Sequence, residues 1–290
     1  MLWALRYNPS MDDKTRSPIV AGMFYPADPS ALRDAVSSLL EVAPPISAPT
    51  RTSTGSVGLI VPHAGYVYSG AVAAAGYAYA GTRCVPGRVI VLGANHSGLG
   101  APVSLASDEA WRTPLGDLPL DAAFIHQLLD AGLVIDDSAF LNEHSIEVQL
   151  PFVQALWGSA APLVPICVKP QSLQGLIRLG RTLADVSSNT PTLIVASSDF
   201  THYEPHDVAT ERDRLALEPI LALDVEGFLT RYYEKRLSIC GAGAIAATME
   251  FARTLDLADT HLLSYATSGD TSGEYGAVVG YAAVSLEGAT

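Results

Sequence analysis

The sequence predicts an α/β protein: a single domain with a mainly parallel central sheet covered by helices. Apolar runs of five to eight residues, typical of buried parallel strands, alternate along the chain with segments of helical periodicity. No internal repeat or low-complexity linker divides the 290 residues, and a hydrophobic content of 49% is enough for one extensive core. We therefore expect an α/β domain over residues 17–290. Residues 1–16 show no periodic pattern and are expected to form a flexible N-terminal extension.

The individual elements follow from the apolar runs and their boundaries. Asp28 is expected to cap the first helix, with Pro29 in its first turn, whereas a later helical segment contains Pro151 in its interior. The Pro-, Ser- and Thr-rich residues 44–56 are expected to be a loop. The expected strands are residues 57–61, 88–93, 161–168, 192–197, 261–269 and 275–286; the expected helices are residues 29–43, 69–80, 120–132, 145–158 and 171–186, with mostly helical structure over 207–255.

Composition argues against several classes of function. Thirty acidic residues against 17 basic ones give a formal net charge of -13, which opposes binding to nucleic acid or to anionic lipid. The three cysteines, Cys84, Cys167 and Cys240, form no CxxC pair and leave an odd number, so a reducing compartment fits better than a disulfide framework. The chain shows no signal-peptide pattern and no apolar run of about 18 residues. We expect a cytoplasmic protein that neither binds nucleic acid nor crosses a membrane.

Three polar side chains follow predicted parallel strands, at the point where each strand ends. His63 comes after "GLIVP", His96 after "VIVLGAN" and Asp199 after "TLIVASS". Ligands of open α/β sheets bind beyond the carboxyl ends of the strands, where these connections converge. We therefore expect the three side chains to lie near one another.

Cys240, in "ICGAG", sits at what looks like the start of a helix, a position that lowers a thiol pKa and favours thiolate. Imidazole, carboxylate and thiolate are the ligand types of a transition-metal site. The spacing is long-range and contains no HExxH or CxxC motif, so the pattern alone leaves a metal site and structural roles both open.

Further candidates have equally plausible structural roles. Asp199 and His202 lie three residues apart in "SDFTHY", which could place both on one side of a loop or first helical turn, although Asp199 could instead be an N-cap. His144 is expected to begin a helix, with Glu143 and Glu147 on adjacent turns. Cys84 and Cys167 fit buried, inert thiols.

Several motifs together resemble one known family. "SPIVAGMFYPADP", "VPHAGYVYSG", "VLGANHSG", "NEHSIEVQLPF", "SSDFTHY", "SICGAGAI" and "SGDTSGEYGAVVGYAAV" occur in the order and spacing of the Memo family, whose prokaryotic members are called AmmeMemoRadiSam system protein B. The resemblance covers about residues 17 to 286. It implies a fold like that of the class III extradiol ring-cleaving dioxygenases, which hold non-haem Fe(II) between two histidines and a carboxylate.

The resemblance also implies a set of site residues. His63, His96 and Cys240 match the metal-binding positions of the family, and His144, Asp199 and His202 match residues that line the same pocket, with catalytic roles in an enzyme. Two positions depart from the usual pattern: Ala94 stands for a proline and Glu204 for a glycine. A cysteine in place of the carboxylate makes copper or zinc possible as well as Fe(II).

The sequence leaves more than one function open. The first is a metal-dependent redox enzyme related to the dioxygenases, acting on a small molecule. The second is a non-catalytic protein that holds metal or a peptide in the same cleft, as the eukaryotic relatives are described to do; Tyr66, Tyr68, Tyr203 and Trp111 are candidates to line that cleft. A weaker third is a zinc-dependent hydrolase. Family association suggests a radical-SAM protein as a partner.

Overall fold

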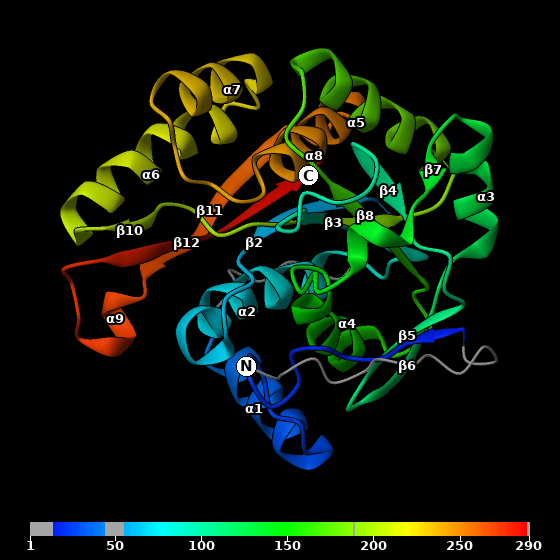
Figure 1. Ribbon diagram of the computed structural model, residues 1–290, viewed down its shortest axis with the longest axis horizontal. Coiled ribbons are helices and arrows are strands. Elements are labelled where there is room, and N and C mark those ends of the chain that lie inside the picture. The colour runs from blue at the N-terminus through cyan, green and yellow to red at the C-terminus, as the bar shows by residue number, and fades with distance from the viewer. Residues whose placement is uncertain (1–13, 44–54, 188, 289–290) are drawn as a thin grey trace, which may run out of the picture.

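The computed structural model describes residues 14–43, 55–187 and 189–288, and its centre is a nine-stranded sheet (Figure 1). Four strands at the middle of this sheet run parallel, in the order β2-β9-β3-β8, and β12 and β4 flank them in antiparallel orientation. The α/β fold class is thus confirmed, with a sheet that is parallel at its centre and mixed at its flanks. The strands are β2 (Val57–Val61), β3 (Arg88–Ala94), β4 (Val103–Leu105), β7 (Val134–Ile135), β8 (Leu163–Val168), β9 (Thr192–Ser197), β10 (His202–Glu204), β11 (Asp259–Thr267) and β12 (Val278–Glu287).

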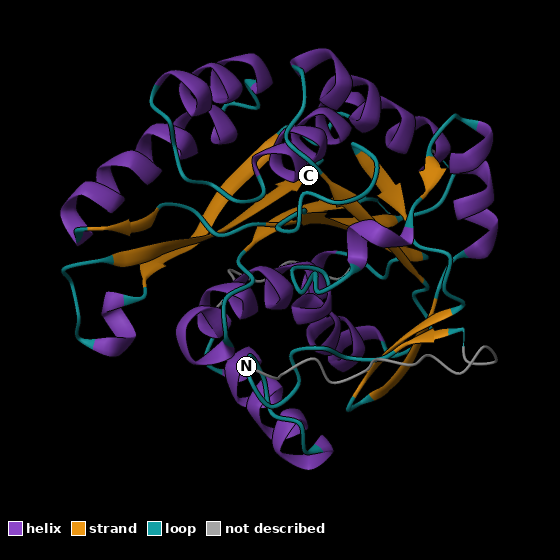
Figure 2. Cartoon of the chain, in the orientation of Figure 1, coloured by secondary structure: helices purple, strands orange, loops and turns teal. Residues whose placement is uncertain are grey.

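Helices cover both faces of the sheet (Figure 2). One face is packed by α1 (Pro29–Glu41), α2 (Tyr66–Arg83) and α4 (Leu150–Trp157), and the other by α5 (Leu173–Ser187), α6 (His206–Leu221), α7 (Val225–Glu234) and α8 (Ala242–Thr254). Two smaller helices, α3 (Ala122–Asp130) and α9 (Gly269–Ser272), lie beside α5 and after β11. Strands β2, β8 and β9 are buried at every residue, as expected for a sheet covered on both sides. Among the described residues, no helix is long and apolar enough to cross a membrane.

The first two helices agree with the sequence prediction in place but not fully in length. The side chain of Asp28 accepts a hydrogen bond from the backbone N–H of Ala31 at 2.9 Å, which confirms it as the N-cap of α1. Helix α2 was expected over residues 69–80 and instead spans Tyr66–Arg83, so it starts three residues after His63. The loop that carries His63 is therefore short.

The prediction of a helix over residues 145–158 is wrong for the first residues of that range. Residues Glu147–Gln149 form a 3-10 turn and α4 begins only at Leu150, which places Pro151 in the first turn of the helix instead of its interior. Proline has no N–H to donate and is tolerated where no helical partner exists. The residues before the turn, His144 among them, are consequently a loop.

A second, three-stranded sheet was not expected. It consists of β1 (Thr15–Arg16), β5 (Ala110–Thr113) and β6 (Gly116–Pro119), with β1 parallel to β5. Strand β1 falls within the expected N-terminal extension. Residues 1–13 of that extension, and residues 44–54 of the expected Pro-rich loop, lie outside the described part of the chain.

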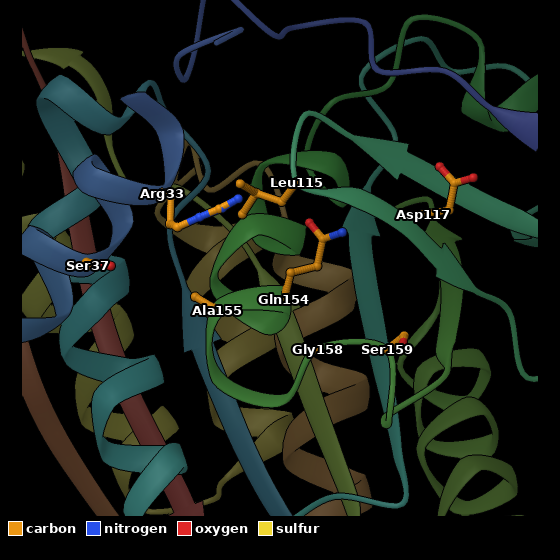
Figure 3. Close-up of a pocket in the computed structure, with 8 residues that line it drawn as sticks. All are labelled: Arg33, Ser37, Leu115, Asp117, Gln154, Ala155, Gly158 and Ser159. Carbon is orange, nitrogen blue, oxygen red and sulfur yellow. The ribbon is translucent and has the colours of Figure 1, made fainter. Parts of the chain in front are cut away.

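The β5–β6 hairpin lies against α4 and borders a cavity of about 520 Å³ that α1 closes on the other side (Figure 3). The side-chain amide of Gln154 joins hairpin and helix, because its Nε2 donates to the carbonyl of Gly116 at 2.9 Å. Arg33 of α1 points toward this amide. None of the lining residues is a candidate site residue from the sequence.

Candidate metal centre

His63 leaves the end of β2 and is held by a buried hydrogen-bond network that fixes its tautomer. Its Nδ1 lies 3.0 Å from Oγ of Ser197. That hydroxyl donates to the carbonyl of Ser145 at 2.6 Å and accepts from Nε2 of Gln149 at 2.8 Å. Gln149 Nε2 must be a donor because it also faces the carbonyl of Pro62 at 2.9 Å. The proton of His63 therefore sits on Nδ1, and the Nε2 lone pair is free to bind a ligand.

His96, beyond the end of β3, is fixed in the same way by a buried carboxylate. Both oxygens of Glu143 lie 3.0 Å from His96 Nδ1, and they also accept the backbone N–H groups of His96 and Ser145 at 2.8 Å. Burial opposes the charge of Glu143, but these hydrogen bonds with His96 hold its pKa at about 2. A carboxylate on Nδ1 leaves Nε2 of His96 as a ligand atom, an arrangement common at metal-bound histidines.

Cys240 comes to the same place from the other side of the sheet, just before α8. Its Sγ lies 3.3 Å from Nε2 of His63 and accepts the backbone N–H of Asp199 at 3.2 Å. Burial, together with the Asp199 carboxylate, raises the pKa of the Cys240 thiol well above its ordinary value. The lowering expected from a helix start is therefore outweighed by burial; Cys240 lies one residue before Gly241, the N-cap of α8. A coordinated cation would reverse this preference, since a coordinating thiol loses its proton.

The three ligand atoms converge. Sγ of Cys240 and one ring nitrogen each of His63 and His96 all lie within 4.8 Å of one another. The side chains expected to bind metal thus form one cluster, although they come from positions 63, 96 and 240 of the chain.

His144 stacks on this cluster from the loop before α4. Its ring is nearly parallel to that of His96, with centroids 4.9 Å apart and an interplanar angle of 9°, and nearly perpendicular to that of His63 at 5.5 Å. Phe24 contacts its other side at 4.7 Å. Burial and the neighbouring His63 lower the pKa of His144 to about 4, so the imidazole is neutral at pH 7.

Close packing of β3 against this loop brings the His144 loop to the cluster. A Cβ at Gly93 would lie 2.5 Å from Ile146 Cγ1 and 2.6 Å from Ser145 Oγ. Any side chain at this position would push the loop away from the strand.

Asp199 and His202 lie at the same edge but have different surroundings. Asp199 Oδ1 accepts the backbone N–H of His63 at 2.8 Å, so it holds the His63 loop and is not a helix N-cap. Burial raises the pKa of this carboxyl group. His202 belongs to strand β10, not to a helical turn, and its Nδ1 donates to carbonyl oxygens of Phe200 and Ser238, each at 2.7 Å. Its Nε2 is consequently unprotonated in the neutral ring.

The ring of His202 does not join the cluster. Among the described residues, His63 has ring contacts with His96 and His144, whereas His202 has one with Tyr203. Burial, followed by the neighbouring His96, lowers the pKa of His63 to about 3. His202 therefore borders the candidate site and has no ring contact with His63 or His96 among the described residues.

Two of the four aromatic candidates are not at the surface of a cleft. Trp111 is 1% exposed and packs on Phe140, and the buried Tyr66 donates its hydroxyl to the carbonyl of Val148 at 2.8 Å. Both belong to the core. Tyr68 and Tyr203, exposed at 46% and 77%, remain available beside the site.

Three residues of the site were missed in the sequence. Glu143, Ser197 and Gln149 orient His63 and His96 through hydrogen bonds, and one oxygen of Glu143 also lies within 4.8 Å of a ring nitrogen of His96 and of His144. Ser197 had a recognisable signal, because it is a polar residue at the end of an otherwise apolar strand. Glu143 and Gln149 had none, since their role depends on a loop that the sequence pattern presents as a helix.

Comparison with known proteins agrees with the motifs. A family model described as "Memo-like protein" matches residues 16–285. The chain belongs to the Memo family. A MEMO1 family protein of Methanopyrus kandleri is 44% identical over 276 residues, covering 93% of this chain and 98% of its own length. MEMO1 family proteins of Methanocaldococcus jannaschii and Nitrosopumilus maritimus are 39% and 38% identical, covering 95% and 93% of this chain and 100% and 98% of their own lengths.

A solved structure supports the fold of this Memo-family chain. The crystal structure of an uncharacterized protein from Escherichia coli K12 matches with a TM-score of 0.52 and 13% sequence identity, over 80% of this chain and 99% of that chain. At this identity the likeness concerns the fold alone.

Proposed function

We propose that this Memo-family chain is a metal-binding redox protein related to the ring-cleaving dioxygenases, with its ion held by His63, His96 and Cys240. The observation that carries the proposal is the convergence of three ligand atoms within 4.8 Å. Buried hydrogen bonds direct the free Nε2 of each histidine into that cluster.

The donor set of two imidazoles and one thiolate suits several metals. We propose Fe(II), in keeping with the related fold; the thiolate makes copper or zinc the alternatives. A redox metal bound here would supply Lewis-acid and electron-transfer chemistry to a small-molecule substrate.

The surrounding side chains provide proton acceptors. His144 is neutral and stacked against His96, which places a basic nitrogen next to the ligands. The unprotonated Nε2 of His202 is a second acceptor at the same edge. Asp199 orients the His63 loop through its backbone N–H. We propose these three residues as the catalytic and positioning groups.

A binding function is the second candidate, favoured by the exposed apolar residues next to the cluster. Val67, Tyr68 and Tyr203 are 80%, 46% and 77% exposed and lie within five residues of His63 or His202. Such a surface suits a peptide or a protein partner, the radical-SAM protein suggested by family association included. A zinc hydrolase is a weaker third candidate, because the same three ligands leave a position open for water.

Metal content and oxygen uptake test the proposal. Protein purified anaerobically should contain close to one iron or copper ion per chain by elemental analysis, and His96→Ala should lose it. The matched control is His126→Ala, which removes an exposed histidine of α3. Equal metal content in wild type and His96→Ala would refute the metal site. With metal present, oxygen consumption across a panel of catechols favours the enzyme, and none favours the binding protein.

A further inference from the structure

A second group of potential ligands lies at the opposite edge of the sheet. Asp259 and His261 are two residues apart on β11, so their side chains point to the same face, and Glu287 ends the neighbouring strand β12. His261 Nε2 lies 3.1 Å from Asp259 Oδ1 and 3.9 Å from Glu287 Oε1. One ligand atom of each residue lies within 4.8 Å of the other two.

The strand register creates an electrostatic conflict at this place. Asp259 pairs directly with Glu287 across the antiparallel β11–β12 ladder. Like charges directly opposite one another destabilise a sheet unless a cation lies between them. Arg83 offsets part of this charge, with its Nε 3.4 Å from Glu287 Oε2. Asp259 pairs instead with His261, whose Nε2 lies 3.1 Å from Asp259 Oδ1.

The carboxyl end of α2 is a second, independent feature that favours a positive charge beside Asp259, His261 and Glu287. Helix α2 ends at Arg83, close to Glu287, and the ring of Tyr79 in its last turns lies 6.3 Å from that of His261. The carboxyl end of a helix carries partial negative charge and favours a cation. Two carboxylates and a helix terminus thus face the same small region.

We propose that Asp259, His261 and Glu287 bind a divalent zinc ion. One imidazole nitrogen and two carboxylate oxygens are ordinary zinc ligands, and ligands of a tetrahedral zinc at about 2.0 Å lie about 3.3 Å apart, between the two distances measured here. Glu287 is already oriented, since the hydroxyl of Tyr79 donates to its Oε1. Asp259 and His261 are 43% and 45% exposed, so water can complete the coordination.

This site shares no residue with the proposed metal centre. Leu286, beside Glu287, pairs with Gly58 near the start of β2, whereas His63 follows the end of that strand. The two groups therefore lie at opposite ends of the same strand. A zinc ion here would link β11 and β12 and lie against the carboxyl end of α2. Its role would be structural.

Zinc titration of the chelator-treated full chain tests the proposal. Calorimetry with zinc chloride should give two ions per chain for wild type, and one each for His261→Ala and Cys240→Ala. The double variant should bind none. His126→Ala is the matched control, because His126 also lies near a carboxylate, 3.7 Å from Asp130, but belongs to no group of three potential ligands in the described part of the chain; this variant should keep two ions.

The outcomes separate this proposal from the function proposed above. If His261→Ala binds as many zinc ions as wild type, with affinity changed by less than threefold, the second site does not exist. If Cys240→Ala loses one zinc ion and His261→Ala loses none, the result supports the first metal centre and refutes the second site. If His261→Ala loses one zinc ion and Cys240→Ala loses none, the result supports the second site and refutes the first metal centre. Asp259→Asn, which should weaken the second ion at least tenfold, repeats the test should His261→Ala lose its circular-dichroism signal.

Discussion

The two ends of strand β2 bring together candidate metal ligands in two different ways. At its carboxyl end, His63, His96 and Cys240 come from three separate connections and are largely or partly buried. At its amino end, Asp259, His261 and Glu287 come from two neighbouring strands, and only Glu287 is buried. The first group is assembled by the fold as a whole, whereas the second needs only one strand pair in register.

The difference lies in what holds the ligands in place. His63 and His96 each donate Nδ1–H to a buried acceptor, Ser197 or Glu143, which is itself fixed by further hydrogen bonds. At the amino end, Glu287 alone has such support, from Tyr79 and Arg83. We therefore expect tighter, more selective binding at the carboxyl end and weaker binding, sensitive to the register of β11, at the amino end.

The largest expected effect is the loss of metal from the carboxyl end in Cys240→Ala. Removing the thiolate should lower the affinity of the first centre by more than about 100-fold, because one of three protein ligands disappears. Calorimetric titration measures this loss. Cys167→Ala is the control: this thiol is fully buried in β8, so its loss should cost about 1 kcal/mol of unfolding free energy and leave metal content unchanged. Metal retained in Cys240→Ala would exclude the thiol as a ligand.

The next effect concerns the carboxylate behind His96. Glu143→Gln should weaken metal binding about 10- to 100-fold, because the neutral amide has one acceptor oxygen in place of two and accepts the His96 Nδ1 proton less strongly. Competition with a chromogenic chelator gives the affinity.

Glu147→Gln is the matched control for Glu143→Gln. Glu147 is also buried but binds the N–H groups of Ile19 and Val20 and the hydroxyl of Tyr25. This change should lower the free energy of unfolding by about 1 to 3 kcal/mol and alter metal affinity little. A larger loss of affinity in Glu147→Gln than in Glu143→Gln would contradict the role given to Glu143.

Ser197→Ala should have a smaller effect on the same centre. Without Oγ, the Nδ1–H of His63 loses its acceptor, and we expect about a fivefold weaker affinity, below the 10- to 100-fold range for loss of a carboxylate partner. Ser285→Ala offers the comparison, since its buried Oγ has no hydrogen-bond partner among the described residues. That variant should bind metal as wild type does, and an effect equal to that of Ser197→Ala would show that the loss is not specific.

The smallest effect is a change in the free energy of unfolding, expected for a variant at the amino end of β2. In metal-free protein, Asp259→Asn removes one of two opposed carboxylates and should raise the free energy of unfolding by about 0.5 kcal/mol. With saturating zinc, the order should reverse, and wild type should be the more stable. Urea unfolding at pH 8 with and without zinc measures both values. Destabilisation of the metal-free variant would mean that Arg83 and His261 already balance the charge.

The sequence predicted the fold, and the edge of the sheet where His63, His96 and Asp199 meet, because both depend on local patterns. Mainly apolar runs identified β2, β8 and β9, and the rule that parallel strands end at one edge brought His63, His96 and Asp199 together. The strands β4 to β7 have only two to four residues each, too few to show a period, and their pairing is decided by tertiary contacts.

The supporting residues could not be predicted for a related reason. Glu143 precedes a segment whose periodicity suggests a helix, yet buried hydrogen bonds to Glu143 and Glu147 stabilise a loop there. The group at the amino end depends on the register of β11 against β12, which shifts between Leu262 and Ser264. No local pattern records such a shift.

The segment before α1 has a practical consequence for anyone designing shortened versions of this protein. Arg16 donates to the carbonyl of Glu143, and Phe24 packs on the ring of His144. Glu147 holds the backbone between these residues at Ile19 and Val20. A version that began at Pro26 would keep every strand of the nine-stranded sheet but lose one wall of the metal centre. Tags and fusion partners therefore belong upstream of Lys14.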